Sequence, residues 1–396
     1  MSAAEGGSTL KKFLAVGVAP SVAPAKAGER VRRAEFDLTS GTIEVPEDAP
    51  EGDALEFLEK AGQDPSEWEA VGFKRSEWGN PEDPFVSTRF SFKRRQAGAE
   101  RPGIEDLLAV IDAHEPDYAP RTGHYTLDAL AVLIGDMQIG QVGASDDPFE
   151  AIKNTLEAID QAAATAEDLG GADQILVAWL GDHVEGFVSQ GGANSWRTKL
   201  TLSEQIRATR RVMYYAVERL APWTNELTMA AVPGNHGEAQ RIGGKGVTAY
   251  SDNHDVEALN AVAEAISMSG NPDFDHVHFL VPERDEISLA VEVGGITWGL
   301  VHGDKWRNGK QFDWWEQQTF HAGPVAGADV LCAGHWHTFI AMEEGRKTYL
   351  QVPTLGTDGM WWAHQHGARP NPGIVLVPVI DGEINAIVPI RVGGER

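Results

Sequence analysis

Five apolar runs in this chain of 396 residues each stop at a glycine-containing turn that carries polar side chains. Short apolar runs closed by such turns are typical of buried strands. Open α/β sheets bind their ligands at the carboxyl ends of their strands, so the repetition predicts that five strand ends meet at a single metal centre. The runs and the residues that follow them are 131–134 with Asp136 and Gln138, 175–180 with Asp182, 227–232 with Asn235 and His236, 296–301 with His302, and 330–333 with His335 and His337.

Each of these residues has an ordinary structural explanation when it is considered alone. An aspartate after a strand can cap a helix, an asparagine can adopt the left-handed conformation of a turn, and one histidine can be satisfied in a core. Such explanations would have to coincide at five matching strand ends, so we reject them for the set.

Predicted helices over 148–170, 202–220 and 256–268 alternate with the runs, as a layered α/β fold requires. After His337 the pattern predicts strands over 339–342, 348–352, 373–380 and 384–390, joined in pairs by hairpin turns. We expect these last strands to build a mostly antiparallel second sheet that packs face to face with the first.

Changes in composition predict four segments. They are a flexible tail over 1–29, a small α+β domain over 30–95, a linker with one helix over 96–121, and the main domain over 122–396. Within the small domain we expect strands over 34–38 and 41–45, a helix over 54–62, a second helix starting at 64–69, and a basic strand over 86–95. The basic strand either contacts phosphates or is a solvated edge, and the second interpretation is the more common.

Bulk properties restrict the surroundings and the partners. No run of about 18 apolar residues is present, so we predict no membrane span. The one cysteine, Cys332, lies in an apolar run and indicates a buried thiol in a cytoplasmic protein. The net charge of −26 argues against a general basic surface that coats nucleic acid, but it does not exclude a local basic groove.

The side chains at the five strand ends favour hard or borderline metals. Asp, His, Asn and Gln without Cys suit manganese, iron, zinc or magnesium. Two such ions about 3.5–4 Å apart can clamp a phosphate and create a hydroxide nucleophile, as in many phosphatases and nucleases. A nearby histidine can protonate the leaving oxygen.

The five motifs, taken together and in order, resemble those of the calcineurin-like metallophosphoesterases. The motifs are Gly135-Asp136-Met137-Gln138, Gly181-Asp182-His183-Val184-Glu185, Gly234-Asn235-His236-Gly237-Glu238, His302-Gly303-Asp304 and Gly334-His335-Trp336-His337. The likeness covers about 125–392 and leaves the role of the first 121 residues open. It implies a layered α-β-β-α sandwich of two mixed sheets.

The resemblance also implies a role for each site residue. Asp136, Gln138, Asp182 and His337 would hold one divalent ion, and Asp182 would bridge to a second ion that Asn235, His302 and His335 also hold. His236 would be the catalytic general acid or would stabilise the phosphoryl oxygens. The family usually has histidine where Gln138 stands; because an amide oxygen is a harder donor, we expect manganese there, with iron, zinc or magnesium as alternatives.

The substrate is less constrained than the metal centre. The Gly-His-X-His form is similar to the nuclease and phosphodiesterase branches, including DNA-repair exonuclease subunits and phage metallophosphoesterases. This implies a metal-activated hydroxide that hydrolyses phosphodiesters, with DNA as the expected substrate. A small-molecule phosphodiesterase or phosphomonoesterase is the alternative that the acidic charge favours, and a non-catalytic binding module is the one that Gln138 favours.

Two further groups of residues are candidates for supporting roles. Arg241 and Lys245 lie in a glycine-rich stretch and would contact a substrate phosphate, although a plain flexible loop explains them equally well. Buried acids and histidines beside metal ligands commonly orient them. The residues that we expect to do so here are His183, Glu185, Glu238 and Asp304. Oligomeric state and cleavage polarity do not follow from the sequence.

Overall fold

The protein is described by a computed structural model, and its contacts divide the chain into two units, Met1–Arg101 and Pro102–Arg396. The structure describes residues 33–36, 40–45, 54–80, 83–94, 103–113, 125–141, 147, 149–189, 198–242, 245–356 and 371–393. The tail predicted over 1–29 lies outside these ranges.

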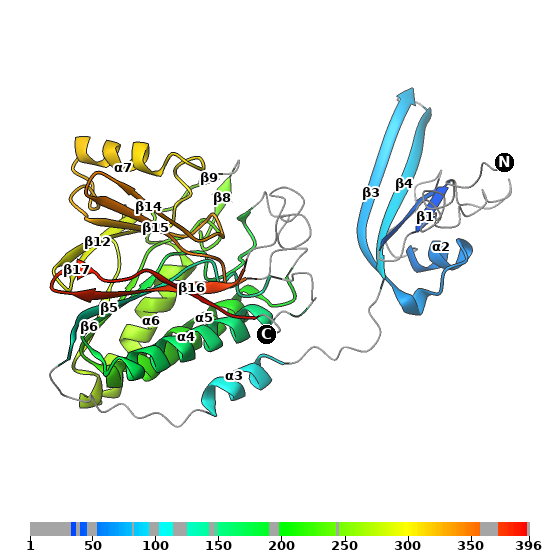
Figure 1. The fold of residues 1–396 in the computed structure, drawn as a ribbon. Helices are drawn as coiled ribbons and strands as arrows, with labels where there is room; N and C mark the ends of the chain where they lie inside the picture. Colours follow the sequence, from blue (N-terminus) through cyan, green and yellow to red (C-terminus); the bar gives the residue numbers. More distant parts are fainter. Residues whose placement is uncertain are drawn as a thin grey trace, which may run out of the picture. The chain divides into compact units, whose positions relative to one another are not determined.

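The first unit is a four-stranded antiparallel sheet with one helix (Figure 1). The sheet has the order β1-β2-β4-β3, and α2 packs on it through Phe57, which stacks on Phe90 at a ring distance of 5.6 Å. The elements are β1 Arg33–Phe36, β2 Ser40–Val45, α2 Ala54–Lys60, β3 Trp68–Asn80 and β4 Asp83–Arg94.

The prediction that a second helix starts over 64–69 is wrong. Only the single 3₁₀ turn Pro65–Glu67 forms there, capped by Asp64, whose side chain accepts a hydrogen bond from Ser66 N at 2.9 Å. The chain then enters β3, because Trp68 is buried in the core of the sheet. The strand is hard to predict because Lys74, Arg75 and Glu77 are polar and exposed.

The second unit contains two mixed sheets. The first has the order β10-β7-β6-β5-β16-β17, with β18 also paired to β16, and the second has the order β11-β12-β13-β15-β14. The strands of the first sheet are β5 Leu127–Ile134, β6 Ala172–Trp179, β7 Thr224–Ala231, β10 Val277–Leu280, β16 Gly373–Ile380, β17 Glu383–Ile384 and β18 Val388–Arg391. Those of the second are β11 Ser288–Val293, β12 Ile296–Val301, β13 Val330–Ala333, β14 Ile340–Glu344 and β15 Lys347–Gln351.

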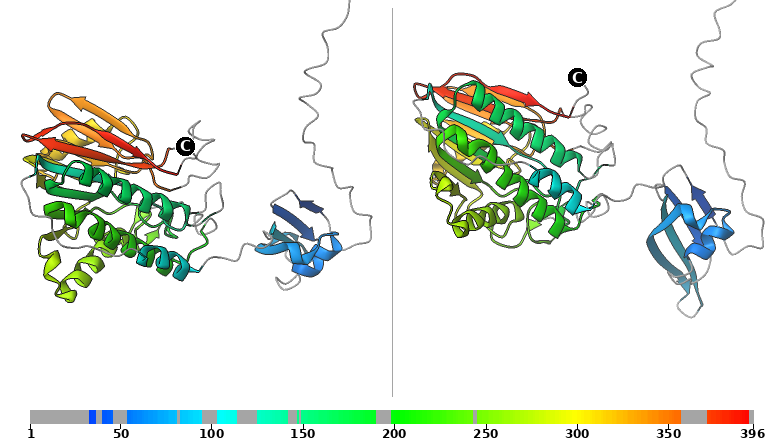
Figure 2. Two further views of the ribbon diagram at one scale, coloured as in Figure 1. Left: turned by 60° about the horizontal axis from the view of Figure 1, so that its bottom comes forward. Right: turned by 90° about the horizontal axis from the view of Figure 1, so that it is seen from below.

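Helices cover the outer faces of both sheets, so the predicted α-β-β-α layering is confirmed (Figures 1 and 2). On β5, Val132 and Ile134 pack towards the helices, while Leu133 packs into the core between the sheets. Both faces are buried, which explains why the strand is a continuous apolar run. The helices are α3 Ile104–Asp112, α4 Glu150–Asp168, α5 Leu202–Leu220, α6 His254–Ser269 and α7 Gln311–Phe320.

The prediction that the last strands build the second sheet is wrong. β16 joins the first sheet, antiparallel to β5, with Leu376 opposite Val132. It is buried along nearly its whole length, which suits a strand between two layers. Of the predicted C-terminal strands only β14 and β15 belong to the second sheet, where β15 runs parallel to β13.

The helix predicted inside the linker is α3, and its buried Leu108 and Ile111 belong to the main core. Arg207 on α5 pairs with Glu105 on α3 at 2.8 Å, which links these two helices of the second unit. None of the helices in the described ranges is long and apolar enough to cross a bilayer.

Candidate metal centre

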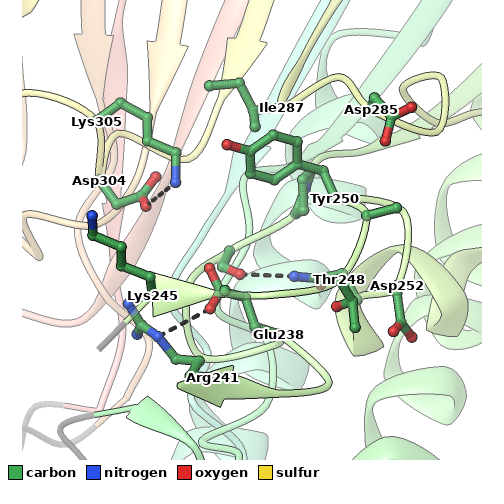
Figure 3. Close-up of a pocket in the computed structure, with 15 residues that line it drawn as sticks. Glu238, Arg241, Lys245, Thr248, Tyr250, Asp252, Asp285, Ile287, Asp304 and Lys305 are labelled. Carbon is green, nitrogen blue, oxygen red and sulfur yellow. Dashed lines mark hydrogen bonds and ion pairs between the residues drawn. The ribbon is translucent and has the colours of Figure 1, made fainter. Parts of the chain in front are cut away.

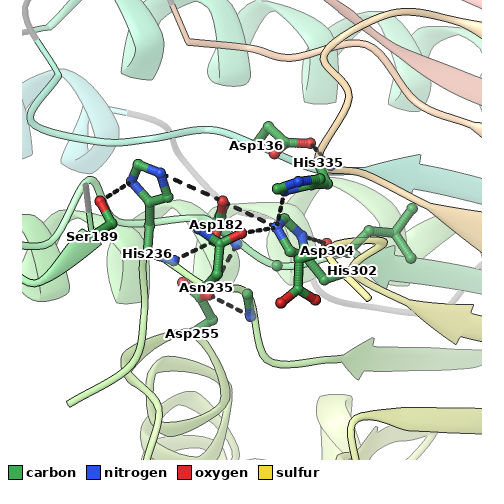
Figure 4. A network of polar contacts seen from close by, with 12 residues as sticks. Asp136, Asp182, Ser189, Asn235, His236, Asp255, His302, Asp304 and His335 are labelled. Carbon is green, nitrogen blue, oxygen red and sulfur yellow. Dashed lines mark hydrogen bonds and ion pairs between the residues drawn. The ribbon is translucent and has the colours of Figure 1, made fainter. Parts of the chain in front are cut away.

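The predicted ligands lie at the carboxyl ends of β5, β6, β7, β12 and β13. Figure 4 shows Asp136, Asp182, Asn235, His302 and His335 among them. Five of the seven non-glycine residues with positive φ in the described ranges belong to this set. They are Asp136 (50°), Gln138 (46°), Asp182 (53°), His335 (67°) and His337 (58°). A residue with a Cβ is strained in this conformation by about 1–3 kcal/mol, and such strain concentrates at functional sites.

Backbone hydrogen bonds between the loops hold these strained residues in place. Asp136 N donates to Gly181 O at 3.0 Å and Gln138 N donates to Asp182 O at 2.9 Å. Asp136 O in turn accepts from Thr354 Oγ1 at 2.7 Å. The loops after β5 and β6 therefore form one rigid framework.

Two glycines are required because the loops approach each other so closely. A Cβ on Gly234 would lie 2.1 Å from Asp182 N, and a Cβ on Gly334 would lie 2.5 Å from Asp136 Oδ2. Neither position can hold a larger residue without moving a ligand. This explains physically why glycine precedes Asn235 and His335 in the motifs.

Three lone pairs converge on His302 Nε2. Asp182 Oδ2 lies 3.0 Å away, Asn235 Oδ1 3.2 Å away and His335 Nδ1 3.3 Å away. The other ring nitrogen, Nδ1, lies 2.8 Å from Leu180 O and donates to it, so Nε2 faces the three acceptors. Since two nitrogens and two oxygens meet around one small space, these residues fit a divalent cation.

A second group of oxygens lies beside the first. Asp136 Oδ1 is 3.3 Å from His337 Nε2, and Asp136 Oδ2 accepts from His335 N at 2.8 Å. Asp136 Oδ1 and Gln138 Oε1 are both fully buried, and neither has a hydrogen-bond partner among the described residues. Buried acceptors without donors are rare, and a cation would satisfy both. The donor set of Asp136, Gln138 and His337 therefore fits a second ion.

The amide at position 138 predicts the metal preference of this second group. In Gln138→His the imidazole should shift selectivity from manganese towards zinc by on the order of tenfold, about 1.4 kcal/mol. Histidine tolerates the positive φ of 46° found there. Competition of both metals against a chelator measures the shift, and Gln317→His, at an exposed glutamine on α7, is the control. An unchanged zinc-to-manganese ratio would mean that residue 138 does not contact the ion.

His236 lies beside the ligands without belonging to the converging set. Its Nε2 is 4.0 Å from Asp182 Oδ2, and its Nδ1 is 2.9 Å from Glu185 O and 3.3 Å from Ser189 Oγ. Burial lowers the pKa of His236, but Asp182 and Glu185 more than offset this and raise it to about 9. Without metal, the ring is therefore protonated at neutral pH.

The structure adds Asp255, which the sequence analysis missed. This carboxylate is fully buried at the start of α6 and accepts hydrogen bonds from Asp182 N (2.9 Å), His183 N (2.9 Å) and Gly234 N (3.1 Å). It ties the loop that carries Asp182 to the loop that carries Asn235. The only sequence signal was Asn253, two residues earlier, whose side chain caps the helix by accepting from Asp255 N.

The expected supporting residues take different positions. Glu185 Oε2 lies 3.4 Å from His236 Nδ1, and His183 Nε2 accepts from Gly181 N at 3.3 Å. Glu238 pairs with Arg241 at 3.0 Å, and Asp304 pairs with Lys305 at 2.7 Å. Of these four side chains, those of Glu185 and His183 thus contact the loops of the centre.

Arg241 and Lys245 lie on the short hairpin of β8 (Arg241–Ile242) and β9 (Lys245–Gly246). They line a cavity of about 500 Å³ beside the centre (Figure 3).

Metal binding should release at least one proton near neutral pH. Burial lowers the pKa of His302, but Asp182 more than offsets this and raises it to about 10. Burial and His302 lower the pKa of His335 to about 4, so this ring is already neutral. A ligating imidazole must be neutral, so at pH 7.5 His302 loses its proton when the ion binds, and the release falls as the pH rises towards 10.

Calorimetric titration with manganese in buffers of different ionisation enthalpy measures this release. The apparent heat should change with the buffer at pH 7.5, and this dependence should weaken at higher pH. A heat that is the same in every buffer at pH 7.5 would contradict a protonated His302.

Comparisons with known proteins give only distant likenesses. No protein-family profile matches the sequence, and no curated protein matches it either. Among solved structures, a zinc complex of Vps29 from Entamoeba histolytica is 14% identical, with a TM-score of 0.30, over 66% of this chain and 98% of the other. An archaeal phosphodiesterase is 11% identical with a TM-score of 0.31, over 66% and 99%.

A third likeness is to a predicted phosphoesterase from Streptococcus pneumoniae, at 10% identity and a TM-score of 0.26, over 64% of this chain and 83% of the other. The chemistry of the centre follows from its own geometry.

Proposed function

We propose that the protein is a dinuclear-metal phosphoesterase of the calcineurin-like type. One observation carries the proposal. Asp182, Asn235 and His335 direct lone pairs at His302 Nε2. His236 is not one of these donors, and its Nε2 is held 4.0 Å from the Asp182 carboxylate. A metal-binding set with a protonated, buried histidine beside it suits hydrolysis of a phosphate ester.

Bound divalent ions would supply Lewis acidity towards the phosphoryl oxygens and a lowered pKa to the attacking water. The remaining tasks belong to side chains of this chain. By the resemblance, Asp182 would bridge the two ligand groups. His236, with Nδ1 2.9 Å from Glu185 O, would hold a proton on Nε2 and donate it to the leaving oxygen.

Among phosphate esters we propose phosphodiesters, with DNA as the first candidate substrate. The support is the resemblance of Gly334-His335-Trp336-His337 to nuclease and phosphodiesterase motifs. A small-molecule phosphodiester is the second candidate, favoured by the net charge of −26 and by the modest cavity of about 500 Å³. A binding module without catalysis remains the third, since Gln138 replaces an imidazole.

The test is hydrolysis of single- and double-stranded DNA beside bis-p-nitrophenyl phosphate, with manganese added or removed by chelation. His236→Ala is the inactivating variant and His278→Ala, an exposed histidine on β10, is its control. DNA cleavage that His236→Ala loses supports the nuclease. Cleavage of the small ester alone supports the second candidate, and bound manganese without any hydrolysis supports the third.

A further inference from the structure

The cavity beside the metal centre shares its walls with the ligand loops. Pro233 and Gly234 line it immediately before Asn235, and Asp304 and Lys305 line it shortly after His302. A group attached to a phosphate at the centre can therefore extend into this space. The volume of about 500 Å³ is in the usual range for sites that enclose a small organic group.

One wall of the cavity offers an apolar, flat surface. Tyr250 is 42% exposed, Ile287 lies next to its ring, and Lys305 Nζ is 5.4 Å from the ring centre (Figure 3). A partly exposed aromatic ring in a cavity is a platform on which another ring can stack. The ammonium fixes the tyrosine ring by a cation–π contact.

The charges of the cavity do not favour a second phosphate. Its three cations are accompanied by four acids, so cations are not in excess. Arg241 pairs with Glu238 at 3.0 Å and Lys305 pairs with Asp304 at 2.7 Å, which neutralises two of them locally. The remaining charges are one cation, Lys245, and two acids, Asp252 and Asp285, so a further anion would meet a net negative charge, whereas an uncharged group would not be repelled.

We propose that this cavity binds one nucleoside, carried by the phosphate that is hydrolysed, with its base stacked on Tyr250. The inference rests on the proposed function and deepens it by naming the substrate class. Because the neighbouring phosphate of a polymer would meet acids here, the enzyme acts on a terminal nucleotide or on a small nucleoside ester. The interior of a strand is disfavoured.

Two esters with the same leaving group test the proposal. Thymidine 5′-(p-nitrophenyl phosphate) carries a nucleoside, and methyl p-nitrophenyl phosphate does not. We expect wild type to prefer the thymidine ester in kcat/KM, and Tyr250→Ala to raise the KM for that ester by about tenfold while the methyl ester is unaffected. Tyr250→Phe keeps the ring and should behave as wild type.

Controls and further substrates complete the design. Met268→Ala changes an exposed side chain on α6 and should alter neither ester. Cleavage of linear but not circular single-stranded DNA would identify strand ends as a source of the nucleoside; cleavage of the thymidine ester alone would identify small esters. Rapid cleavage of circular DNA would overturn the proposal.

Two negative results have different meanings. Equal kcat/KM values for the two esters, unchanged in Tyr250→Ala, would overturn the nucleoside site and leave the phosphoesterase intact. Absence of hydrolysis of either ester with manganese bound would overturn the proposed function, and the nucleoside site with it.

Discussion

Replacing His236 by alanine should lower kcat for DNA hydrolysis by about 10²- to 10⁴-fold, the usual contribution of a positioned general acid. Bound metal should be unchanged, because the side chain approaches Asp182 Oδ2 only to 4.0 Å and gives no lone pair to the converging set. The variant therefore separates catalysis from metal binding.

The leaving group makes this test specific. An alkoxide leaving from DNA needs a proton, whereas p-nitrophenolate does not, so His236→Ala should lose less activity with bis-p-nitrophenyl phosphate than with DNA. Steady-state rates with both substrates, together with metal content, measure the difference. Equal losses with both substrates, or loss of metal, would contradict the role of His236 as a proton donor.

Replacing Asp255 by alanine should destabilise the protein by at least about 3 kcal/mol, because buried amide groups would lose their acceptor. The donors are the backbone amides of Asp182, His183 and Gly234. Asp255→Asn keeps the volume and one acceptor oxygen, so it should fold but bind metal about 10- to 100-fold more weakly, as when a residue that orients ligands is changed.

Urea unfolding and metal titration measure these two effects. Glu257→Ala is the matched control, since it removes an acid from the same helix that pairs with Arg210 at 3.2 Å on the surface. Such an exposed pair contributes about 0–1 kcal/mol. If Asp255→Asn bound metal as tightly as wild type, Asp255 would be a helix cap and no more.

The layers and the strand ends could be predicted because both depend on local signals. A run such as 175–180 is apolar at every position, which indicates burial on both faces, and Gly181 closes it at the one place where a ligand can follow. The structure brings Asp182, Asn235, His302 and His335 together at those ends.

Other features depend on distant partners that the sequence does not reveal. β16 is as apolar as any strand of the second sheet, and only its pairing with β5 decides its place. Asp255 acts on amides of Asp182 and Gly234, which are remote in the chain, so its own neighbours predict a helix cap. β3 is an edge strand, and its sequence lacks the alternation of apolar and polar residues on which strand prediction relies.

Five site residues have a left-handed backbone, which costs folding free energy at the positions that the metal centre needs. They are Asp136, Gln138, Asp182, His335 and His337. At Gln138, glycine would relieve the strain and remove a buried acceptor that has no hydrogen-bond partner among the described residues, so this exchange would stabilise the metal-free protein. Directed evolution for thermostability alone should for the same reason erode this centre first. Stabilised variants of this protein therefore need selection for metal binding in every round.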